Sequence, residues 1–424
     1  MRFTERKDTM KYMKRLFRRK RLFALLLALL LLPYGAVAAV AEAIPVSSGG
    51  IDVSVYDLFG EDLLAGAEAL ELDAVSAVLM EANTGTVLYE MNADAALPPA
   101  SVTKIMTLLL VMEAIDSGKI ALTDTVTVSA HAASMGGSQV FLEEGESMTV
   151  EDLLKSVVIA SANDAAVALA EYVAGSEESF VAAMNARAAE LGAVNAHFEN
   201  TNGLDDTAAH HVLSARDIAI LSRALIAHET ILKYSSIWMD TIRDGAFGLT
   251  NTNRLVRFYR GCTGLKTGST AKAGFCVSVT AERDGLSLIC VIMGAKTRDS
   301  RNASATKLLD FGFANFACVK EPEGTPEPIP VTGGVTPLCP VSYPAFSAVV
   351  PKSEMGRVRL EVTLVPSVAA PVKAGDVLGE VVYFCGEKEL SRVPVTADAP
   401  VARIGYGEML LRLVRCFLLA ARES

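Results

Sequence analysis

An almost unbroken apolar run from Ile105 to Ile115 constrains the fold of this chain more than any other feature. Its residues are apolar around nearly the whole helical circumference, which predicts a helix that is buried on all sides. Other elements must therefore pack around it. We expect the helix to begin near Ser101, just after Pro98-Pro99 ends an extended segment.

Both flanks of this run carry patterns for elements that could surround it. Short apolar and β-branched runs bounded by turn residues predict strands, and longer stretches with helical periodicity predict helices. The strands are expected over residues 75–80, 86–91, 275–280 and 286–293, and the helices over 150–160, 164–173, 178–191 and 303–316. This order predicts an α+β domain whose sheet combines both ends of the segment.

The first residues are strongly basic, whereas the rest of the chain is acidic. Residues 1–21 contain ten Lys or Arg and two Asp or Glu, a charge of +8, within a chain whose formal net charge is −10. The remaining residues therefore carry −18, the difference between these two values. An acidic body is a poor electrostatic match for a phosphate backbone, so we expect no binding to nucleic acid.

The basic segment is followed by an apolar run, residues 22–32, then by Pro33 and small residues up to Ala39. This succession predicts a cleavable secretory signal peptide over residues 1–38. An uncleaved anchor helix is the alternative, but eleven apolar residues are fewer than the about 20 that span a bilayer. We therefore expect an exported protein that works outside the cytoplasmic membrane.

The composition changes again after the α+β unit. Following a lead-in over residues 39–71, that unit is expected to occupy residues 72–319. Residues 320–340 are rich in Pro, Gly, Thr and Glu, which predicts a linker. Short β-branched runs then predict a small all-β domain over residues 341–402.

The last segment, residues 403–424, predicts an amphipathic helix. Its charged stripe falls within roughly 80° of arc on a helical projection, and the rest of the circumference is apolar. The residues of this stripe are Glu408, Arg412, Arg415 and Arg422. A short helix of this kind can lie in the membrane interface. Packing against the chain's own β domain is the alternative.

The cysteines indicate neither a metal site nor a redox motif. Seven are spread singly along the chain and no His pair has ligand spacing, so we expect no metal and no cofactor. Cys276 and Cys290 lie in two apolar runs joined by Asp284-Gly285, a hairpin signal. A disulfide between them and two buried free thiols are both compatible with this pattern.

Ser101 and Lys104 form the most informative chemical pattern. If Ser101 opens the buried helix, Lys104 lies one turn further along the same face. A serine is a weak nucleophile until a base accepts its proton, and a lysine can be that base when burial and positive neighbours lower its pKa. N–H groups at the helix start can also bind a developing oxyanion. The pair predicts a Ser–Lys acyl-transfer centre.

The spacing Ser-x-x-Lys alone is a weak signal, because residues 304–307 and 269–272 match it too. We expect only a structural role for the former, which lies inside a predicted helix. Two further motifs follow Ser101 in order. Ser161-Ala162-Asn163 lies at a break between predicted helices, where capping is the alternative role. Lys266-Thr267-Gly268 leads into a strand, where the glycine would let a substrate backbone approach closely.

These motifs and their surroundings resemble the serine D-alanyl-D-alanine carboxypeptidases, the low-molecular-mass penicillin-binding proteins. The matching stretches are Leu97–Thr107, Ser161–Ala166, Asn202–Asp205, Ser214–Asp217 and Gly264–Gly268. The resemblance covers roughly residues 72–316 and implies the β-lactamase/DD-peptidase-like fold, a helical cluster on a mixed-order antiparallel sheet. The β domain and the amphipathic tail also resemble the C-terminal parts of that family.

The resemblance implies an exported, penicillin-sensitive enzyme that removes the terminal D-Ala from peptidoglycan stem pentapeptides ending in D-Ala-D-Ala. Ser101 would be acylated and Lys104 would be its general base. Ser161 and Lys266 would pass a proton to the leaving amine. β-Lactam antibiotics would act as covalent inhibitors, and the protein would work at the outer face of the cytoplasmic membrane, in the cell-wall space.

The resemblance also implies a set of substrate-binding residues: Asn163, Lys266, Thr267, Gly268, Ser269 and Arg301. Asn163 would orient the peptide, and the N–H groups of Ser101 and Ser269 would form the oxyanion hole. Thr267 and Arg301 would hold the terminal carboxylate, for which an arginine is well suited. A solvated charge at a helix start is the alternative for Arg301, and Lys296 and Arg298 are near enough to compete for the role.

Two rival functions fit parts of the pattern. A serine β-lactamase would share the Ser–Lys pair, but resemblance to class A enzymes would demand a Glu-x-x-Leu-Asn setting, and the dipeptide Leu-Asn does not occur in this chain. A non-catalytic cell-wall binding or scaffold protein would be expected to lose the serine or the lysine.

One stretch departs from the family, because residues 210–214 lack the expected aromatic-Ser-Thr run. We expect this departure to alter a surface turn and no catalytic residue.

Overall fold

Residues 70–205 and 209–420 are described by the computed structural model of the chain. The predicted signal peptide and the lead-in segment up to residue 69 lie outside the described residues, as does Arg422 of the predicted charged stripe.

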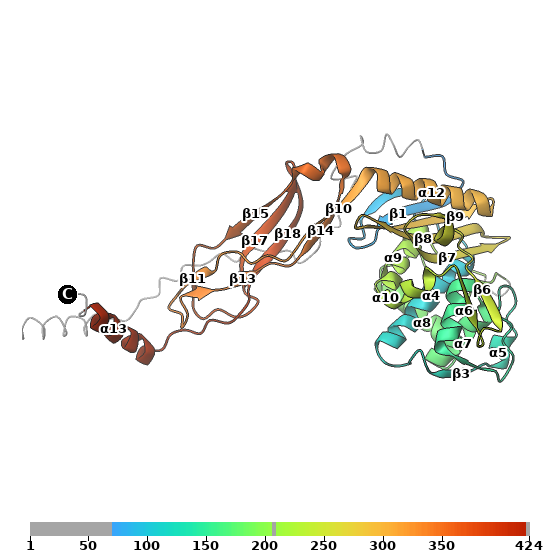
Figure 1. The fold of residues 1–424 in the computed structure, drawn as a ribbon, viewed down its shortest axis with the longest axis horizontal. Coiled ribbons are helices and arrows are strands. Elements are labelled where there is room, and N and C mark those ends of the chain that lie inside the picture. Colours follow the sequence, from blue (N-terminus) through green and yellow to red (C-terminus); the bar gives the residue numbers. More distant parts are fainter. Residues whose placement is uncertain (1–69, 206–208, 421–424) are drawn as a thin grey trace, which may run out of the picture. The chain divides into compact units, whose positions relative to one another are not determined.

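A five-stranded antiparallel sheet organises the first domain, with strand order β2-β1-β9-β8-β7 (Figure 1). Its strands are β1 (Ser76–Glu81), β2 (Val87–Met91), β7 (Cys262–Thr270), β8 (Gly274–Arg283) and β9 (Leu286–Ala295). The N-terminal hairpin joins the C-terminal strands in the middle of the sheet, where β1 pairs with β9. The predicted α+β fold, with a sheet built from both ends of the segment, is confirmed.

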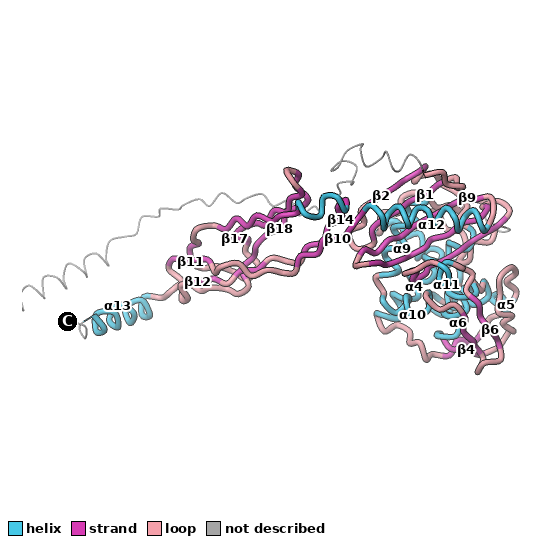
Figure 2. The backbone as a smooth tube through the Cα atoms, turned by 45° about the horizontal axis from the view of Figure 1, so that its top comes forward, coloured by secondary structure: helices cyan, strands magenta, loops and turns pink. Residues whose placement is uncertain are grey.

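Both faces of this sheet are covered by helices. Successive side chains of a strand point to opposite faces, and in β1 Val78 enters one apolar core whereas Leu79 enters the other. Helix α12 (Arg298–Asn315) lies against one face, and α9 (Ala215–Ile226) leads the helical cluster on the other (Figures 1 and 2). The strands are apolar on both sides because neither face meets water.

The apolar run forms α4 (Lys104–Asp116), which is preceded by the 3₁₀ turn η2 (Ala100–Thr103). Four helices contact α4, which explains why nearly its whole circumference is apolar. They are α6 (Val150–Ala160), α7 (Asn163–Ala174), α8 (Glu177–Glu190) and α9. The shorter elements are α5 (Ala130–Ala133), α10 (Glu229–Ser235), α11 (Leu255–Phe258) and the hairpins β3 (Thr125–Thr127) with β4 (Ser147–Thr149) and β5 (Met239–Ile242) with β6 (Phe247–Thr250).

The helix predicted over residues 303–316 begins earlier, at Arg298. A capping box starts it: the Thr297 hydroxyl accepts the Ser300 N–H at 3.0 Å, and the Ser300 hydroxyl accepts the Thr297 N–H at 3.1 Å. These reciprocal bonds satisfy N–H groups that the first helical turn leaves free. The added turn places Arg301 inside the helix.

A separate apolar core belongs to the second, all-β domain. There the Phe346 and Tyr383 rings stack with centroids 3.8 Å apart. Its elements are β10 (Phe316–Glu321), β11 (Ile329–Thr332), β12 (Leu338–Cys339), β13 (Val341–Ser342), β14 (Phe346–Pro351), η3 (Lys352–Arg357), β15 (Val358–Leu364), β16 (Val368–Ala369), β17 (Val377–Cys385) and β18 (Lys388–Ala397).

The interpretation of residues 320–340 as a linker is wrong. Ile329 and Val331 of β11 and Cys339 of β12 are buried in the core of the β domain, and β11 pairs with both β12 and β16. Pro330, which lies between these two inward side chains of β11, is exposed, as is Thr332. The abundance of Pro and Gly therefore marks turns and outward positions, and the composition hides a short inward-outward alternation typical of a strand.

The cysteines are free thiols. Cys276 of β8 lies in the core on the α4 side of the sheet, whereas Cys290 of β9 lies in the core beneath α12. A disulfide between them would have to pass through the sheet. Of the two arrangements compatible with the sequence, the structure therefore has the two buried free thiols.

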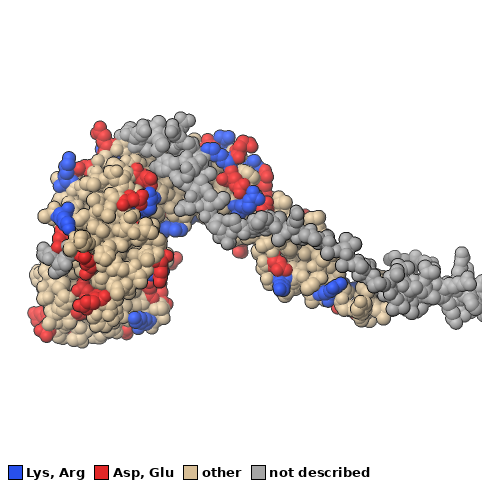
Figure 3. Space-filling model, turned by 180° about the vertical axis from the view of Figure 1, so that it is seen from behind, with Lys and Arg blue, Asp and Glu red and all other residues tan. Residues whose placement is uncertain are grey.

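Acidic and basic side chains are interspersed on the face of the molecule drawn in Figure 3. Several form ion pairs that join distant elements. The Arg216 guanidinium of α9, for example, contacts the carboxylates of Glu90 and Asp94, each at 2.8 Å. Such exposed pairs contribute only about 0–1 kcal/mol each, so the two cores remain the main source of stability.

The predicted terminal helix is α13 (Tyr406–Ala420). Several of its large apolar side chains are exposed: Leu410, Leu411, Leu413, Val414, Phe417 and Leu418. No helix in the described part of the chain combines the length and apolar character needed to cross a membrane.

Candidate active site

Ser101 lies on the 3₁₀ turn η2, and Lys104 is the first residue of α4. The turn begins at Ala100, whose φ of 49° lies in the left-handed region that non-glycine residues rarely adopt. This geometry brings Lys104 Nζ to 2.9 Å from Ser101 Oγ. The structure therefore brings together the predicted nucleophile and its predicted base.

The environment of Lys104 favours a neutral amine. The side chain is fully buried, and burial, helped by the positive charge of Lys266, lowers its pKa well below the usual value, while Asp164 opposes the shift. Its Nζ also contacts Asn163 Oδ1 at 2.6 Å and Asn202 O at 2.9 Å. These oxygens only accept, so they occupy the two N–H groups of a neutral amine. The lone pair is left for the Ser101 hydroxyl.

Ser161 and Lys266 form a second pair, whose serine lines the same cleft as Ser101. Ser161 ends α6 with a φ of 64°, in the left-handed region, and Lys266 lies in β7. Lys266 Nζ donates to Ser161 Oγ at 2.8 Å and to the Thr267 carbonyl at 2.9 Å. Burial, with a contribution from the charge of Arg301, lowers the pKa of Lys266 to about 7. A group with this pKa can hold or release a proton near neutral pH.

A cleft of about 680 Å³ is lined by the serines of both pairs. Ser101, Ser161, Thr267, Gly268, Ser269 and Arg301 line it together with Ser138, Trp238, Thr250, Asn251, Thr252, Arg254, Phe258 and Arg298. Three arginines and no carboxylate occur among these lining residues. The cleft is therefore suited to an anionic ligand.

Arg301 is buried rather than a solvated charge at a helix start, with only 2% of its surface exposed. It donates to the Cys276 carbonyl at 3.3 Å and to Asn302 Oδ1 at 2.9 Å. Of its two possible competitors, Arg298 also lines the cleft, whereas the exposed Lys296 side chain lies 4.0 Å from Asp73. Arg301 has no acidic partner in the described part of the chain, so its guanidinium is available to a substrate carboxylate.

Gly268 lies against the turn that carries Ser101. A Cβ at this position would lie 2.8 Å from the Ser101 nitrogen and 2.9 Å from the Pro99 oxygen. The missing side chain therefore lets β7 approach the protein's own nucleophile turn, and the close approach of a substrate backbone stays a prediction. Neighbouring Thr267 contacts the Thr252 hydroxyl at 2.8 Å.

Residues 210–214 also differ from expectation. We predicted an altered surface turn without catalytic contacts, but His211 is only 6% exposed and its Nε2 lies 2.8 Å from the hydroxyl of Thr103, next to Lys104. An antiparallel bridge between His197 and Val212 holds this segment in place. The two bridged segments have no periodic pattern, so the sequence contains no signal for the burial of His211.

We predicted no role for Asn202, although it lies in one of the stretches that carry the family resemblance. The Lys104 contact to its carbonyl involves backbone, which no residue-type motif can report. By contrast, the Ser304–Lys307 match is structural as predicted, because Lys307 Nζ donates to the Glu71 carbonyl and Ser304 Oγ accepts the Asp73 N–H.

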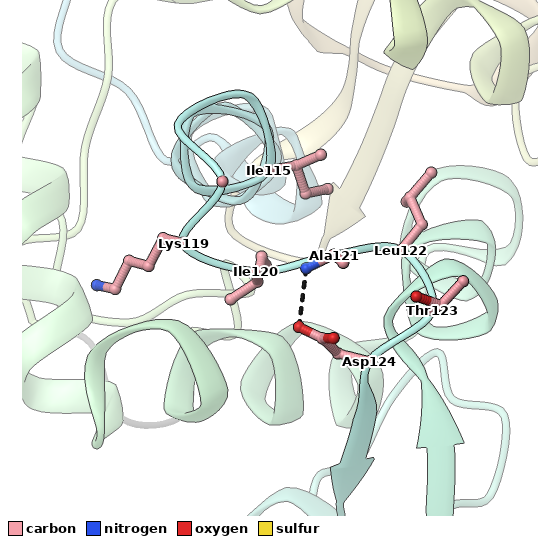
Figure 4. A pocket seen from close by; sticks show the side chains of 8 residues that line it. Ile115, Lys119, Ile120, Ala121, Leu122, Thr123 and Asp124 are labelled. Atoms are coloured by element: carbon pink, nitrogen blue, oxygen red, sulfur yellow. Dashed lines mark hydrogen bonds between the residues drawn. The ribbon is translucent and has the colours of Figure 1, made fainter.

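A second hollow lies at the far end of α4 (Figure 4). It is lined by Ile115 and residues 118–124, and the Ala121 N–H donates to Asp124 Oδ2 at 2.8 Å across it. Since α4 has thirteen residues, this hollow is about 20 Å from Lys104. It shares no residue with the Ser101 cleft.

Comparison with known proteins identifies the family of this chain. A family model described as D-alanyl-D-alanine carboxypeptidase matches residues 64–297, and one described as penicillin-binding protein 5, C-terminal domain, matches residues 343–403. The chain is similar to D-alanyl-D-alanine carboxypeptidase DacF of Bacillus subtilis, with 42% identity over 355 residues that cover 80% of this chain and 89% of that protein.

Solved structures agree. Penicillin-binding protein 5 from Haemophilus influenzae matches with a TM-score of 0.70 and 31% identity, over 78% of this chain and 98% of that one. Penicillin-binding protein D2 from Listeria monocytogenes, in its ampicillin-bound form, matches with a TM-score of 0.54 and 33% identity, over 57% of this chain and 99% of that one. The chain therefore belongs to the serine D-alanyl-D-alanine carboxypeptidases, the low-molecular-mass penicillin-binding proteins, and is a serine hydrolase that acts on peptidoglycan.

Proposed function

We propose that Ser101 is the nucleophile of this carboxypeptidase and that Lys104 is its general base. The contact between Lys104 Nζ and Ser101 Oγ carries this proposal, because the two carbonyl oxygens of Asn163 and Asn202 leave the amine lone pair directed at the serine. Ser101 Oγ attacks the carbonyl carbon of the penultimate D-Ala while its proton passes to Lys104. The C–N bond then breaks, and the terminal D-Ala leaves.

The leaving amine needs a proton, and Ser161 with Lys266 supplies the route. The Lys266 ammonium donates to Ser161 Oγ, which can pass its own proton on to the amine in the cleft. Water then attacks the ester carbonyl: its hydroxyl bonds to the acyl carbon, its proton goes to Ser101 Oγ as the C–O bond breaks, and the shortened peptide leaves. Lys104 gives up the proton that it took and Lys266 regains one, so both lysines return to their starting states. No cofactor takes part in this sequence.

Substrate orientation falls to the remaining residues of the site. Thr267 and Arg301 hold the terminal carboxylate, since a buried guanidinium without an acidic partner is a strong donor to such a group. The N–H groups of Ser101 and Ser269 stabilise the oxyanion, and Asn163 orients the peptide. Gly268 keeps β7 close enough to Ser101 for these groups to act together.

We expect β-lactams to acylate Ser101 and the resulting acyl-enzyme to be hydrolysed slowly. A β-lactamase needs a group that activates water for deacylation, and no carboxylate lines the described cleft. Penicillin should therefore inhibit this enzyme, and rapid, complete turnover of nitrocefin by the purified protein would favour the β-lactamase alternative instead.

We further propose that residues 1–38 export the protein and are removed, and that the mature enzyme works at the outer face of the cytoplasmic membrane. In this arrangement residues 39–71 lead into a catalytic domain over 72–319. The β domain extends to residue 402, and the segment from 403 binds the membrane surface through α13. The exposed apolar side chains of α13 support this last assignment over packing against the β domain.

Labelling with a fluorescent penicillin tests the nucleophile. Ser101→Ala should abolish labelling and D-Ala release from a pentapeptide ending in D-Ala-D-Ala, because it removes the hydroxyl that contacts Lys104 Nζ. Ser304→Ala is a matched control, since Ser304 belongs to the structural Ser-x-x-Lys pattern, and it should retain both activities. Equal labelling of wild type and Ser101→Ala would refute the assignment.

A further inference from the structure

The turn that carries Ser101 is held from behind by one hydroxyl. The backbone at Ala100 is in the left-handed region, and Thr103 Oγ1 donates to the Ala100 carbonyl at 2.8 Å. An unfavourable backbone conformation persists only where its surroundings fix it. Thr103 is fully buried, so no water replaces this bond.

His211 completes a directional chain of hydrogen bonds to this hydroxyl. Its Nδ1 accepts the Glu199 N–H at 3.1 Å, so the ring proton is on Nε2. Nε2 therefore donates to Thr103 Oγ1 at 2.8 Å, which leaves the threonine proton for the Ala100 carbonyl. Burial lowers the pKa of His211 to about 4, so the ring is neutral at physiological pH and keeps this single tautomer.

The surrounding residues leave little freedom for another arrangement. The edge of the His211 ring meets Phe198, with centroids 5.7 Å apart. On the other side of the turn, a Cβ at Gly203 would lie 1.9 Å from the Ala100 oxygen and 2.7 Å from Thr103 Oγ1. The loop that includes Gly203 also presents the Asn202 carbonyl to Lys104. The loop of Asn202 and Gly203 thus contacts both the back of the turn and the base.

We propose that His211 is a positioning residue for acylation. Through Thr103 it fixes the Ala100 carbonyl and hence the turn that sets Ser101 against Lys104. It touches no substrate, and its effect rests on the proposed role of that serine–lysine pair.

Two substitutions of His211 separate this role from a merely structural one. In His211→Gln the amide nitrogen reaches the position of Nε2 and keeps the donor to Thr103, but the Glu199 N–H loses its acceptor. In His211→Asn the amide oxygen keeps the acceptor for Glu199, but the donor to Thr103 is lost. Each variant removes the ring and one hydrogen bond, so thermal stability should fall similarly in both.

The readout is the rate constant of acylation by a fluorescent penicillin. It is corrected for the fraction of the protein that the penicillin can label at saturation. Because misplacing a reacting group by about 1 Å can cost about 100-fold, we expect His211→Asn to acylate roughly 10- to 100-fold more slowly, and His211→Gln to stay within about 3-fold of wild type. Equal rates for both variants, or a slower His211→Gln, would overturn the proposal.

Thr103 provides an independent test. Thr103→Ser retains the hydroxyl and should keep most of the wild-type acylation rate, whereas Thr103→Val lacks the hydroxyl and should acylate slowly. Adding His211→Asn to Thr103→Val should then have little further effect, because the two residues act in one chain. Additive losses would contradict the chain. Labelling of Ser101→Ala would refute the proposed nucleophile, so the two failures remain distinguishable.

Discussion

At the scale of single residues, the catalytic domain buries two lysines that have no carboxylate partner within hydrogen-bond distance. Lys104 and Lys266 instead contact hydroxyl and carbonyl oxygens. Burial disfavours the charged form of each amine, and each therefore has a lowered pKa. The same feature that prepares these side chains for proton transfer reduces the stability of the folded chain at neutral pH.

The cost in stability of burying a lysine can be measured at Lys266. Its pKa is about 7 in the folded protein against an ordinary value of 10.5. Between these values the unfolded chain binds more protons than the folded chain, so the free energy of unfolding rises with pH through this window. Below about pH 7 the amine is protonated in both states, and the destabilisation caused by its burial is complete. We expect the free energy of unfolding of wild type to rise between pH 7.5 and 9.5 by up to about 1.4 kcal/mol per pH unit more than that of Lys266→Met.

Urea denaturation of both proteins at the two pH values provides the measurement. Loss of the bonds to Ser161 and Thr267 affects Lys266→Met equally at each pH, so the change with pH isolates the buried amine. The exposed Lys119→Met should keep the wild-type change. Parallel behaviour of wild type and Lys266→Met would show that Lys266 is charged in the folded protein.

At the scale of elements, the contact between β7 and η2 assembles the site. Gly268→Ala should force these elements apart, because the new Cβ would meet three backbone atoms of residues 99–102 at 2.8–2.9 Å. We expect acylation by penicillin to slow by about 100-fold or more. Gly248→Ala in β6 is the matched control, since its Cβ would enter open space, and it should acylate within about 2-fold of wild type.

Both variants should be compared by the rate of penicillin labelling and by circular dichroism. A normal rate for Gly268→Ala with an unchanged spectrum would mean that β7 can retreat from η2 without consequence for Ser101. The proposed function of Gly268 would then be wrong.

Elements with a strong local pattern were predictable from the sequence. The run at 105–115 is apolar because four helices pack against it, and β1 and β9 are apolar because both faces of the sheet are covered. β11 was missed because only Ile329 and Val331 point inward within a segment rich in turn residues. The start of α12 was missed because its capping box of Thr297 and Ser300 contains no apolar signal.

The candidate site was predictable to the extent that its residues carry distinctive spacing. Ser101, Lys104, Ser161 and Lys266 lie in short motifs, and the structure brings them together. His211 and Asn202 contribute through one long-range hydrogen bond each, and the use of Gly268 depends on the distance between two elements. Such relationships are properties of tertiary packing, which a residue pattern does not report.

At the scale of the whole molecule, three parts of the chain have different charge. The basic head is the proposed export signal, the body is acidic, and Arg412 and Arg415 are exposed on α13 beside its apolar residues. An enzyme whose substrate is the peptidoglycan outside the membrane benefits from a tether that keeps it near the site of synthesis. α13 is the described element with the composition for that tether.

Flotation with vesicles of phosphatidylcholine and phosphatidylglycerol tests the tether. Chains lacking the proposed signal peptide should float when they contain α13 and remain in the dense fraction when they end at Gly405. Replacing Arg412 and Arg415 by Gln should weaken binding by about 1 kcal/mol per residue, or roughly 30-fold in total at low salt. Replacing Leu410 and Leu418 by Gln should weaken it at every salt concentration, because apolar burial is not screened. Equal flotation of the full-length and the shortened chain would show that α13 does not bind the membrane.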